Sequence, residues 1–196
     1  RLQGDSRFSR LLNFSSVGMY GMSAGGHTAL TLAGGRWSPS LLRDHCQNHL
    51  ADDFVTCAGP SVGLTGSVLD GPKKALVRAI NDVKFNDPAW YSHTDARIKV
   101  AVAGVPFAVD FDPDSFSKLT AKLGIISARK DRWLVPKYHS DFILTHCKEC
   151  VHLLDLPTGA HGALLSPLFP NLSSHMATLI GDPPDFDRAT SVPRIN

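Results

Sequence analysis

The serine at position 23 is the residue whose type and setting most clearly suggest chemistry. It lies at the centre of Gly21-Met22-Ser23-Ala24-Gly25, which follows a short apolar run and precedes a helix-forming segment. A strand, a tight turn and a helix in this order hold a serine hydroxyl exposed on a strained backbone, beside a base that can activate it. The motif predicts a nucleophile elbow, with Ser23 as nucleophile and the Ala24 amide as an oxyanion donor at the helix start.

The glycines around Ser23 support this interpretation and also permit a second one. We expect Gly21 and Gly25 to leave room where Cβ atoms would clash, and Gly26 to let the helix pack close to the strand. The same stretch reads Gly-x4-Gly-His27-Thr28, one substitution away from a phosphate-binding loop. Because His27 replaces the lysine that would contact the phosphates, nucleotide binding is the weaker interpretation.

A base and an acid must accompany such a serine, and on this kind of turn they follow in the order Ser, Asp, His. His161 comes after a strand-like segment, between Gly159 and Gly162, and is the predicted base. We expect most of the other eight histidines to be surface or cap residues. Asp131 follows a predicted strand by three residues and is the predicted acid, which would hold the His161 tautomer. The alternative acids are Asp110, Asp112 and Asp114, which follow the preceding strand, and Asp155 inside a strand.

The composition suits one globular domain and indicates no charged partner. The chain has 196 residues, 43% of them hydrophobic, and a formal net charge of +2. Lys and Arg form no block that would indicate nucleic-acid binding, and no apolar run approaches the roughly 20 residues needed to span a bilayer. Glu149 is the only glutamate, so a catalytic carboxylate is expected to be an aspartate.

Four cysteines form two pairs that are local in sequence. We expect a disulfide between Cys46 and Cys57, whereas Cys147 and Cys150 are either bridged or free thiols. Zinc binding, with help from neighbouring histidines, is a weaker alternative because neither pair has an established zinc spacing. Disulfides indicate an oxidising compartment, so we expect a secreted or periplasmic protein.

Strand-like and helix-like segments alternate along the chain. Strands are predicted at 17–20, 97–105, 123–128 and 151–156, the first of them short and buried. Helices are predicted at 24–33 and 135–145, and the end of a helix at 2–12. This alternation predicts an α/β fold with a parallel sheet flanked by helices, whose reactive groups lie at the carboxyl ends of the strands.

The predicted domain covers residues 1–180, with a cap or insert at about 37–96. The insert is rich in Pro, Gly and Asp, so we expect it to be irregular apart from one helical stretch near 72–81. Residues 181–196 are expected to form a tail that follows the surface or is partly disordered. Candidate walls of a substrate pocket are Met22, Trp90, Phe107 and Trp133.

Several stretches of the chain together resemble a known superfamily. Residues 18–30 around Ser23, the segment 95–102, Asp131 and the turn 159–162 are similar to the α/β-hydrolase superfamily, most closely to predicted dienelactone hydrolases and platelet-activating-factor acetylhydrolase-like esterases. The resemblance implies hydrolysis of a small-molecule ester by Ser23, His161 and Asp131, without a metal or organic cofactor. Dienelactone hydrolases use a cysteine nucleophile, so Ser23 makes lactone cleavage the weaker expectation.

The position of the serine departs from that pattern. In the superfamily, about a hundred or more residues precede the nucleophile, including the loop that gives the second oxyanion donor. The chain is therefore expected to correspond to the carboxyl-terminal part of such an enzyme, with the amino-terminal segment as a possible separate partner chain. The alternative hypothesis is a hydrolase-like binding or interaction module that lacks catalysis because that part is missing.

Overall fold

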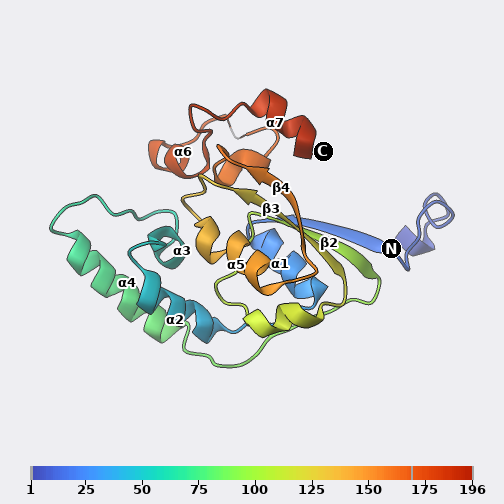
Figure 1. Cartoon of the computed structure of the whole chain (residues 1–196), viewed down its shortest axis with the longest axis horizontal. Helices are drawn as coiled ribbons and strands as arrows, with labels where there is room; N and C mark the ends of the chain where they lie inside the picture. Colours follow the sequence, from blue (N-terminus) through green and yellow to red (C-terminus); the bar gives the residue numbers. More distant parts are fainter. Residues whose placement is uncertain (1, 169, 196) are drawn as a thin grey trace.

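An all-parallel, four-stranded sheet is the framework of the molecule, described by a computed structural model over residues 2–168 and 170–195 (Figure 1). The strands β1 (Val17–Met22), β2 (Ile98–Gly104), β3 (Lys122–Ala128) and β4 (Val151–Leu156) lie in the order β1-β2-β3-β4. Register pairs such as Met22 with Gly104 and Ala128 with Leu156 align their carboxyl ends. The α/β class and the parallel sheet predicted from the sequence are confirmed.

Helices and short 3-10 turns precede, connect and follow the strands. Outside the insert they are η1 (Leu2–Gly4), α1 (Ala24–Ala33), η2 (Pro113–Lys118), η3 (Pro136–Tyr138), α5 (Ser140–His146), η4 (His161–Leu164), α6 (Ser174–Ile180) and α7 (Arg188–Ile195). Helix α1 has the predicted bounds, and Gly34 ends it in the left-handed conformation with φ 119°. The predicted helix end at 2–12 is wrong, since only Leu2–Gly4 is helical there, and the predicted helix at 135–145 is split into η3 and α5 at His139.

The insert is more regular than its composition predicts. It contains α2 (Pro39–His49), α3 (Phe54–Ala58) and α4 (Asp70–Lys84), so the expectation of a single helical stretch is wrong. Helix α4 contains the one stretch predicted, 72–81. Helix α2 was not predicted because Pro39 looks like a helix breaker, although it lies in the first turn, where proline is tolerated. In Figure 1 the three helices form a layer beside α1 and α5, away from the sheet.

The main core lies on one face of the sheet. Helix α1 contributes Leu30 and α5 contributes Ile143, which pack with Ala101 and Ile125 from the strands. Parallel connections are almost always right-handed, so strands that follow one another in chain order receive their connecting segments on the same face. Large side chains on the other face are half exposed, namely Tyr20, Val100 and Leu153. Strand β1, which the sequence predicts to be buried, is therefore largely exposed.

The segment after residue 180 is anchored to the rest of the molecule. Phe186 is buried in a small cluster with Leu156 and Ala163, and Arg188 donates a hydrogen bond to the Gly162 carbonyl at 3.1 Å. Phe186 and Arg188 therefore attach this segment to the domain; Asn196 lies outside the described residues. In the part of the chain that is described, we find no helix with the length and apolarity required to cross a membrane.

The uneven covering of the sheet predicts unequal costs for two truncations. Ile125 is fully buried under the helices, so Ile125→Ala should lower the free energy of unfolding by about 2–5 kcal/mol. Leu153 is 51% exposed on the opposite face, so Leu153→Ala should cost less than about 1 kcal/mol. Urea unfolding measures both variants, and equal losses would show that the second face is covered in solution.

Candidate active site

Ser23 occupies a strained turn directly after β1. Its backbone has φ 55° and ψ −116°, a conformation that costs a non-glycine residue about 1–3 kcal/mol and persists only when its surroundings impose it. The Ser23 amide donates to the Gly104 carbonyl at 3.0 Å, and the Ser23 carbonyl accepts from the amides of His27 at 3.0 Å and Phe107 at 3.2 Å. The end of β2 and the first turn of α1 thus hold the serine in this conformation.

Two of the three neighbouring glycines are required by close approach. A Cβ atom at Gly21 would lie 2.0 Å from the Gly25 carbonyl oxygen, and one at Gly26 would lie 2.8 Å from the Pro106 Cα. Gly26 therefore lets α1 approach the segment after β2. The expected clash at Gly25 is wrong, because a Cβ atom there would meet open space.

Ser23, His161 and Asp131 meet at the carboxyl edge of the sheet. The Ser23 Oγ lies 3.0 Å from His161 Nε2, and His161 Nδ1 lies 2.7 Å from Asp131 Oδ2. Asp131 follows β3, and His161 opens η4 after β4, so three different strands deliver the three side chains. The side chains of His161 and Asp131 are 4% and 1% exposed, which removes water that would compete for their hydrogen bond.

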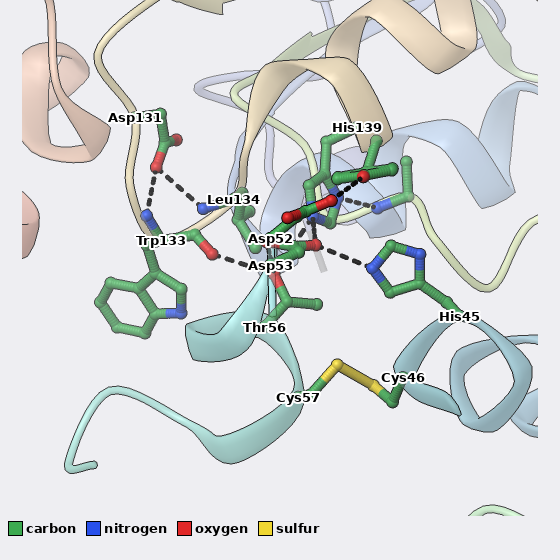
Figure 2. Close-up of polar contacts among 12 residues, drawn as sticks. His45, Cys46, Asp52, Asp53, Thr56, Cys57, Asp131, Trp133, Leu134 and His139 are labelled. Carbon is green, nitrogen blue, oxygen red and sulfur yellow. Dashed lines mark hydrogen bonds and ion pairs between the residues drawn. A yellow bond between two sulfur atoms is a disulfide. The ribbon is translucent and has the colours of Figure 1, made fainter. Parts of the chain in front are cut away.

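Backbone amides orient the Asp131 carboxylate. Its Oδ1 accepts from the amides of Trp133 at 2.9 Å and Leu134 at 2.8 Å (Figure 2). The other oxygen, Oδ2, is left for His161. An ionised carboxylate only accepts hydrogen bonds, so His161 carries its proton on Nδ1 and offers the Nε2 lone pair to the Ser23 hydroxyl. This is the tautomer that a general base needs.

The structure brings two of the predicted pocket walls to the site. The Trp133 ring lies 4.9 Å from the His161 ring, and Phe107 is joined to Ser23 through its backbone amide. Ala24 is the first residue of α1, so its amide has no carbonyl partner within the helix and remains available as a donor.

The other two predicted walls differ in their position. Met22 is the last residue of β1 and packs on the cluster that contains Leu156, directly before the serine turn. Trp90 is half exposed and lies under the Arg36 guanidinium, 4.5 Å from ring centroid to Cζ, in the insert. The structure therefore does not bring Trp90 to the three side chains.

The alternative acids are engaged elsewhere. Asp114 lies in η2, where its amide donates to Asp112. Asp110 pairs with His27 at 3.1 Å and Asp112 with Arg36 at 2.5 Å. Asp155 pairs with Arg129 at 2.6 Å. The Asp110 Oδ1 atom is buried without a partner among the described residues.

A second buried cluster of histidine and aspartate lies beside the Asp131 loop (Figure 2). Asp53 Oδ2 lies 2.9 Å from His45 Nε2 and 3.2 Å from His139 Nε2, and its Oδ1 lies 2.9 Å from the Thr56 hydroxyl. His139 is an exception to the expectation that most histidines other than His161 lie at the surface or in the cap, since it is 1% exposed and accepts the Ala108 amide at Nδ1. His45, Asp53 and Thr56 are close in the sequence, but His139 lies 86 residues after Asp53, so no local pattern marks the complete cluster.

Hydrogen bonds set the charge of Asp53. Burial alone would raise the pKa of its carboxyl, but hydrogen bonds from His139, His45 and Thr56 outweigh burial and hold the pKa well below its usual value. His139 accepts at Nδ1, so its Nε2 carries a proton and donates to Asp53. An imidazole in that tautomer cannot ligate a metal through Nε2.

The cysteines are fully used by disulfides. Cys46 is bonded to Cys57 and Cys147 to Cys150, with S–S distances of 2.10 and 1.93 Å. The first bridge is the one expected from the sequence, and the second resolves the open choice in favour of a disulfide. The zinc alternatives thereby lose their thiolate ligands, and the described residues contain no group of three or more His, Cys, Asp or Glu suited to a metal ion.

Two features near the site were not predicted from the sequence. Arg188 donates to the carbonyls of Gly162 and Leu165 and pairs with Asp182, so the tail supports the turn that carries His161. A cavity of about 510 Å³ lies between the insert, the Asp131 loop and α6, and Asp131 is among its lining residues. Contacts to main-chain carbonyls leave no pattern in a sequence, which is why the tail was not recognised as a support.

No protein-family model, curated protein or solved structure matches the chain. The chemistry of the site is therefore inferred from its geometry alone. A serine hydroxyl bonded to a buried imidazole, itself bonded to a buried carboxylate, can be deprotonated as it attacks an electrophilic carbon. A free helix-start amide beside the serine can stabilise the oxyanion that results.

The serine turn should respond oppositely to two alanine substitutions. Gly21→Ala places a Cβ atom against the Gly25 carbonyl and should cost about 3 kcal/mol or more, because backbone must move. Gly25→Ala adds a methyl in open space inside α1 and should be neutral or stabilising by up to about 1 kcal/mol. Thermal and urea unfolding measure both, and a tolerated Gly21→Ala would contradict the close approach.

The lowered pKa of Asp53 predicts acid-dependent stability. Its folded-state pKa lies below the unfolded value of about 3.9, so Asp53 stabilises the fold above that pH and the contribution is lost as the pH falls below it. Asp53→Asn should lower the free energy of unfolding at pH 7 and flatten its decline below about pH 4. Urea unfolding at a series of pH values tests this, with Asp52→Asn as a control for removal of one exposed neighbouring carboxyl.

Proposed function

We propose that the protein is a serine hydrolase that cleaves carboxylic esters through Ser23, His161 and Asp131. The observation that carries the proposal is the continuous hydrogen-bonded series from Ser23 Oγ to His161 Nε2 and from His161 Nδ1 to Asp131, at 3.0 and 2.7 Å. The strained conformation of Ser23 at the start of α1 supports it further, because structural serines have no need of such a turn.

In the proposed reaction, Ser23 Oγ attacks the ester carbonyl while His161 Nε2 takes the hydroxyl proton. Asp131 keeps the imidazole oriented and stabilises its positive charge. The Ala24 amide donates to the oxyanion of the tetrahedral intermediate. His161 then returns the proton to the departing alcohol, which leaves an acyl group on Ser23. Water activated by the same imidazole releases the acid and restores the free serine.

The fold and the site support the further proposal that the chain is related to the α/β-hydrolase superfamily, with dienelactone hydrolases and platelet-activating-factor acetylhydrolase-like esterases as the nearest resemblance. The strand–serine turn–helix unit and the delivery of the acid and base after later strands fit that pattern. The proposed chemistry uses only side chains and backbone amides. The two disulfides support a site of action in an oxidising compartment, outside the cell or in a periplasm.

A fluorophosphonate probe tests the function without knowledge of the substrate. The wild-type chain should gain one adduct on Ser23, visible by intact-mass analysis and peptide mapping. Ser23→Ala should gain none, and His161→Ala should react more than about 10³-fold more slowly because the hydroxyl loses its base. Asp131→Asn should also react much more slowly, since an amide at this position favours the wrong imidazole tautomer. Hydrolysis of short p-nitrophenyl esters should show the same ranking.

The competing hypothesis is a hydrolase-like binding module without catalysis. It predicts a folded chain that forms no adduct on Ser23 and hydrolyses no ester. Circular dichroism and urea unfolding of the same samples establish folding, so an absent adduct in folded protein would overturn the proposed hydrolase. An adduct that persists in Ser23→Ala would remove the proposed nucleophile instead.

A further inference from the structure

Thr56, a residue of the insert, touches the loop that carries the acid of the site. Its hydroxyl lies 2.9 Å from the Trp133 carbonyl oxygen and 2.9 Å from Asp53 Oδ1 (Figure 2). The insert and the Asp131 loop are separated by 77 residues between Thr56 and Trp133, so this contact is a tertiary one. It joins the layer of α2, α3 and α4 to the end of β3.

The Trp133 carbonyl and the Leu134 amide belong to one planar peptide unit. The Leu134 N–H of that unit donates to Asp131 Oδ1 at 2.8 Å, while its C=O on the opposite side meets Thr56. Because the peptide is rigid and planar, its two ends rotate together. A rotation that released the carbonyl from Thr56 would also turn the Leu134 N–H away from the Asp131 carboxylate.

Trp133 adds two more links to the same unit. Its own amide donates to Asp131 Oδ1 at 2.9 Å, and its ring lies 4.9 Å from the His161 ring. Movement of this residue therefore disturbs the acid and the base together. The insert contacts Trp133 through Thr56, and Trp133 in turn contacts both Asp131 and His161.

Asp53 fixes Thr56 from the other side. It is 1% exposed and is held by hydrogen bonds from His45 of α2 and His139, which is fixed in turn by the Ala108 amide. Thr56 has one hydroxyl proton to share between the Asp53 carboxylate and the Trp133 carbonyl. The carboxylate thus sets the position of the hydroxyl relative to the peptide unit.

The disulfide strengthens this arrangement. Cys46 follows His45 and Cys57 follows Thr56, so the bridge joins the helices that carry two of the Asp53 partners. Helix α3 has only five residues, too few to be stable without tertiary contacts. The bridge therefore keeps α3, and with it the Thr56 hydroxyl, in place.

We propose that Thr56 and Asp53 are positioning residues, which fix the Trp133–Leu134 peptide unit and thereby orient the Asp131 carboxylate toward His161. This inference rests on the proposed function, because it assigns the insert a part in the same site. Neither residue touches the reacting atoms; they act through the peptide unit alone.

The test compares Thr56→Val, which keeps the shape and removes the hydroxyl, with Thr56→Ser, which restores it. Thr120→Val is the matched control, since Thr120 also donates from its hydroxyl to a backbone carbonyl, that of Ala33, far from the site. Thr56→Val should lower kcat on p-nitrophenyl acetate by about 10- to 100-fold with KM nearly unchanged, because misplaced catalytic groups lose rate rather than binding. Thr56→Ser should recover most of the loss, and Thr120→Val should leave kcat unchanged.

A second measurement does not depend on turnover. The proton on His161 Nδ1, bonded to Asp131, gives a downfield proton resonance whose position reports the geometry of that bond. Thr56→Val should shift or broaden this resonance, while Thr56→Ser and Thr120→Val should keep it at the wild-type position. Asp53→Asn is the second variant, expected to act like Thr56→Val, and decides the matter if Thr56→Val fails to fold.

Different results would contradict the two proposals. The hydrolase proposal is contradicted if the wild-type chain is folded and shows the resonance but forms no fluorophosphonate adduct. In that case, the response of the resonance to Thr56→Val still tests the positioning role. A wild-type kcat and an unmoved resonance in folded Thr56→Val would overturn the positioning role and leave the hydrolase intact. A loss of kcat that Thr56→Ser does not recover would also overturn it, since the hydroxyl would not be the cause.

Discussion

The common direction of the four strands is the constraint on which the rest of the structure depends. Because β1, β3 and β4 all end at the same edge, residues that are distant in sequence arrive together as each strand stops. Ser23, Asp131 and His161 each lie in the first turn or loop after a strand, so the sheet supplies the approximate geometry. The same chain order places α1 and α5 on one face and leaves Tyr20 and Leu153 facing water on the other.

Local contacts then turn this approximate geometry into hydrogen-bonding distance. The absence of side chains at Gly21 and Gly26 lets the serine turn close against the end of β2, and paired amides direct one face of the Asp131 carboxylate. Support for the site comes from both directions along the chain. The insert contacts the Asp131 loop at Trp133, and Arg188 of the tail contacts the turn that carries His161.

The sequence predicts well the features that depend on consecutive residues. The motif around Ser23, the bounds of α1 and β4, and the turn that holds His161 follow from apolar runs and glycine spacing. Helix α4 of the insert was predicted, but α2 was not, because proline in a first helical turn looks like a helix breaker when helix ends are unknown. The environment of His139 was missed because burial of a polar side chain depends on partners such as Asp53, 86 residues away.

The disulfide between Cys46 and Cys57 makes the surroundings of the site depend on cysteine oxidation, which the sheet alone does not require. The four strands and α1 contain no cysteine, so they can form before any sulfur is oxidised. Helix α3, next to the Asp131 loop, is in contrast linked to α2 by a covalent bond whose formation requires an oxidant. In reducing surroundings this helix lacks its covalent link to α2, so the contact of Thr56 with the Trp133 carbonyl depends on noncovalent packing alone.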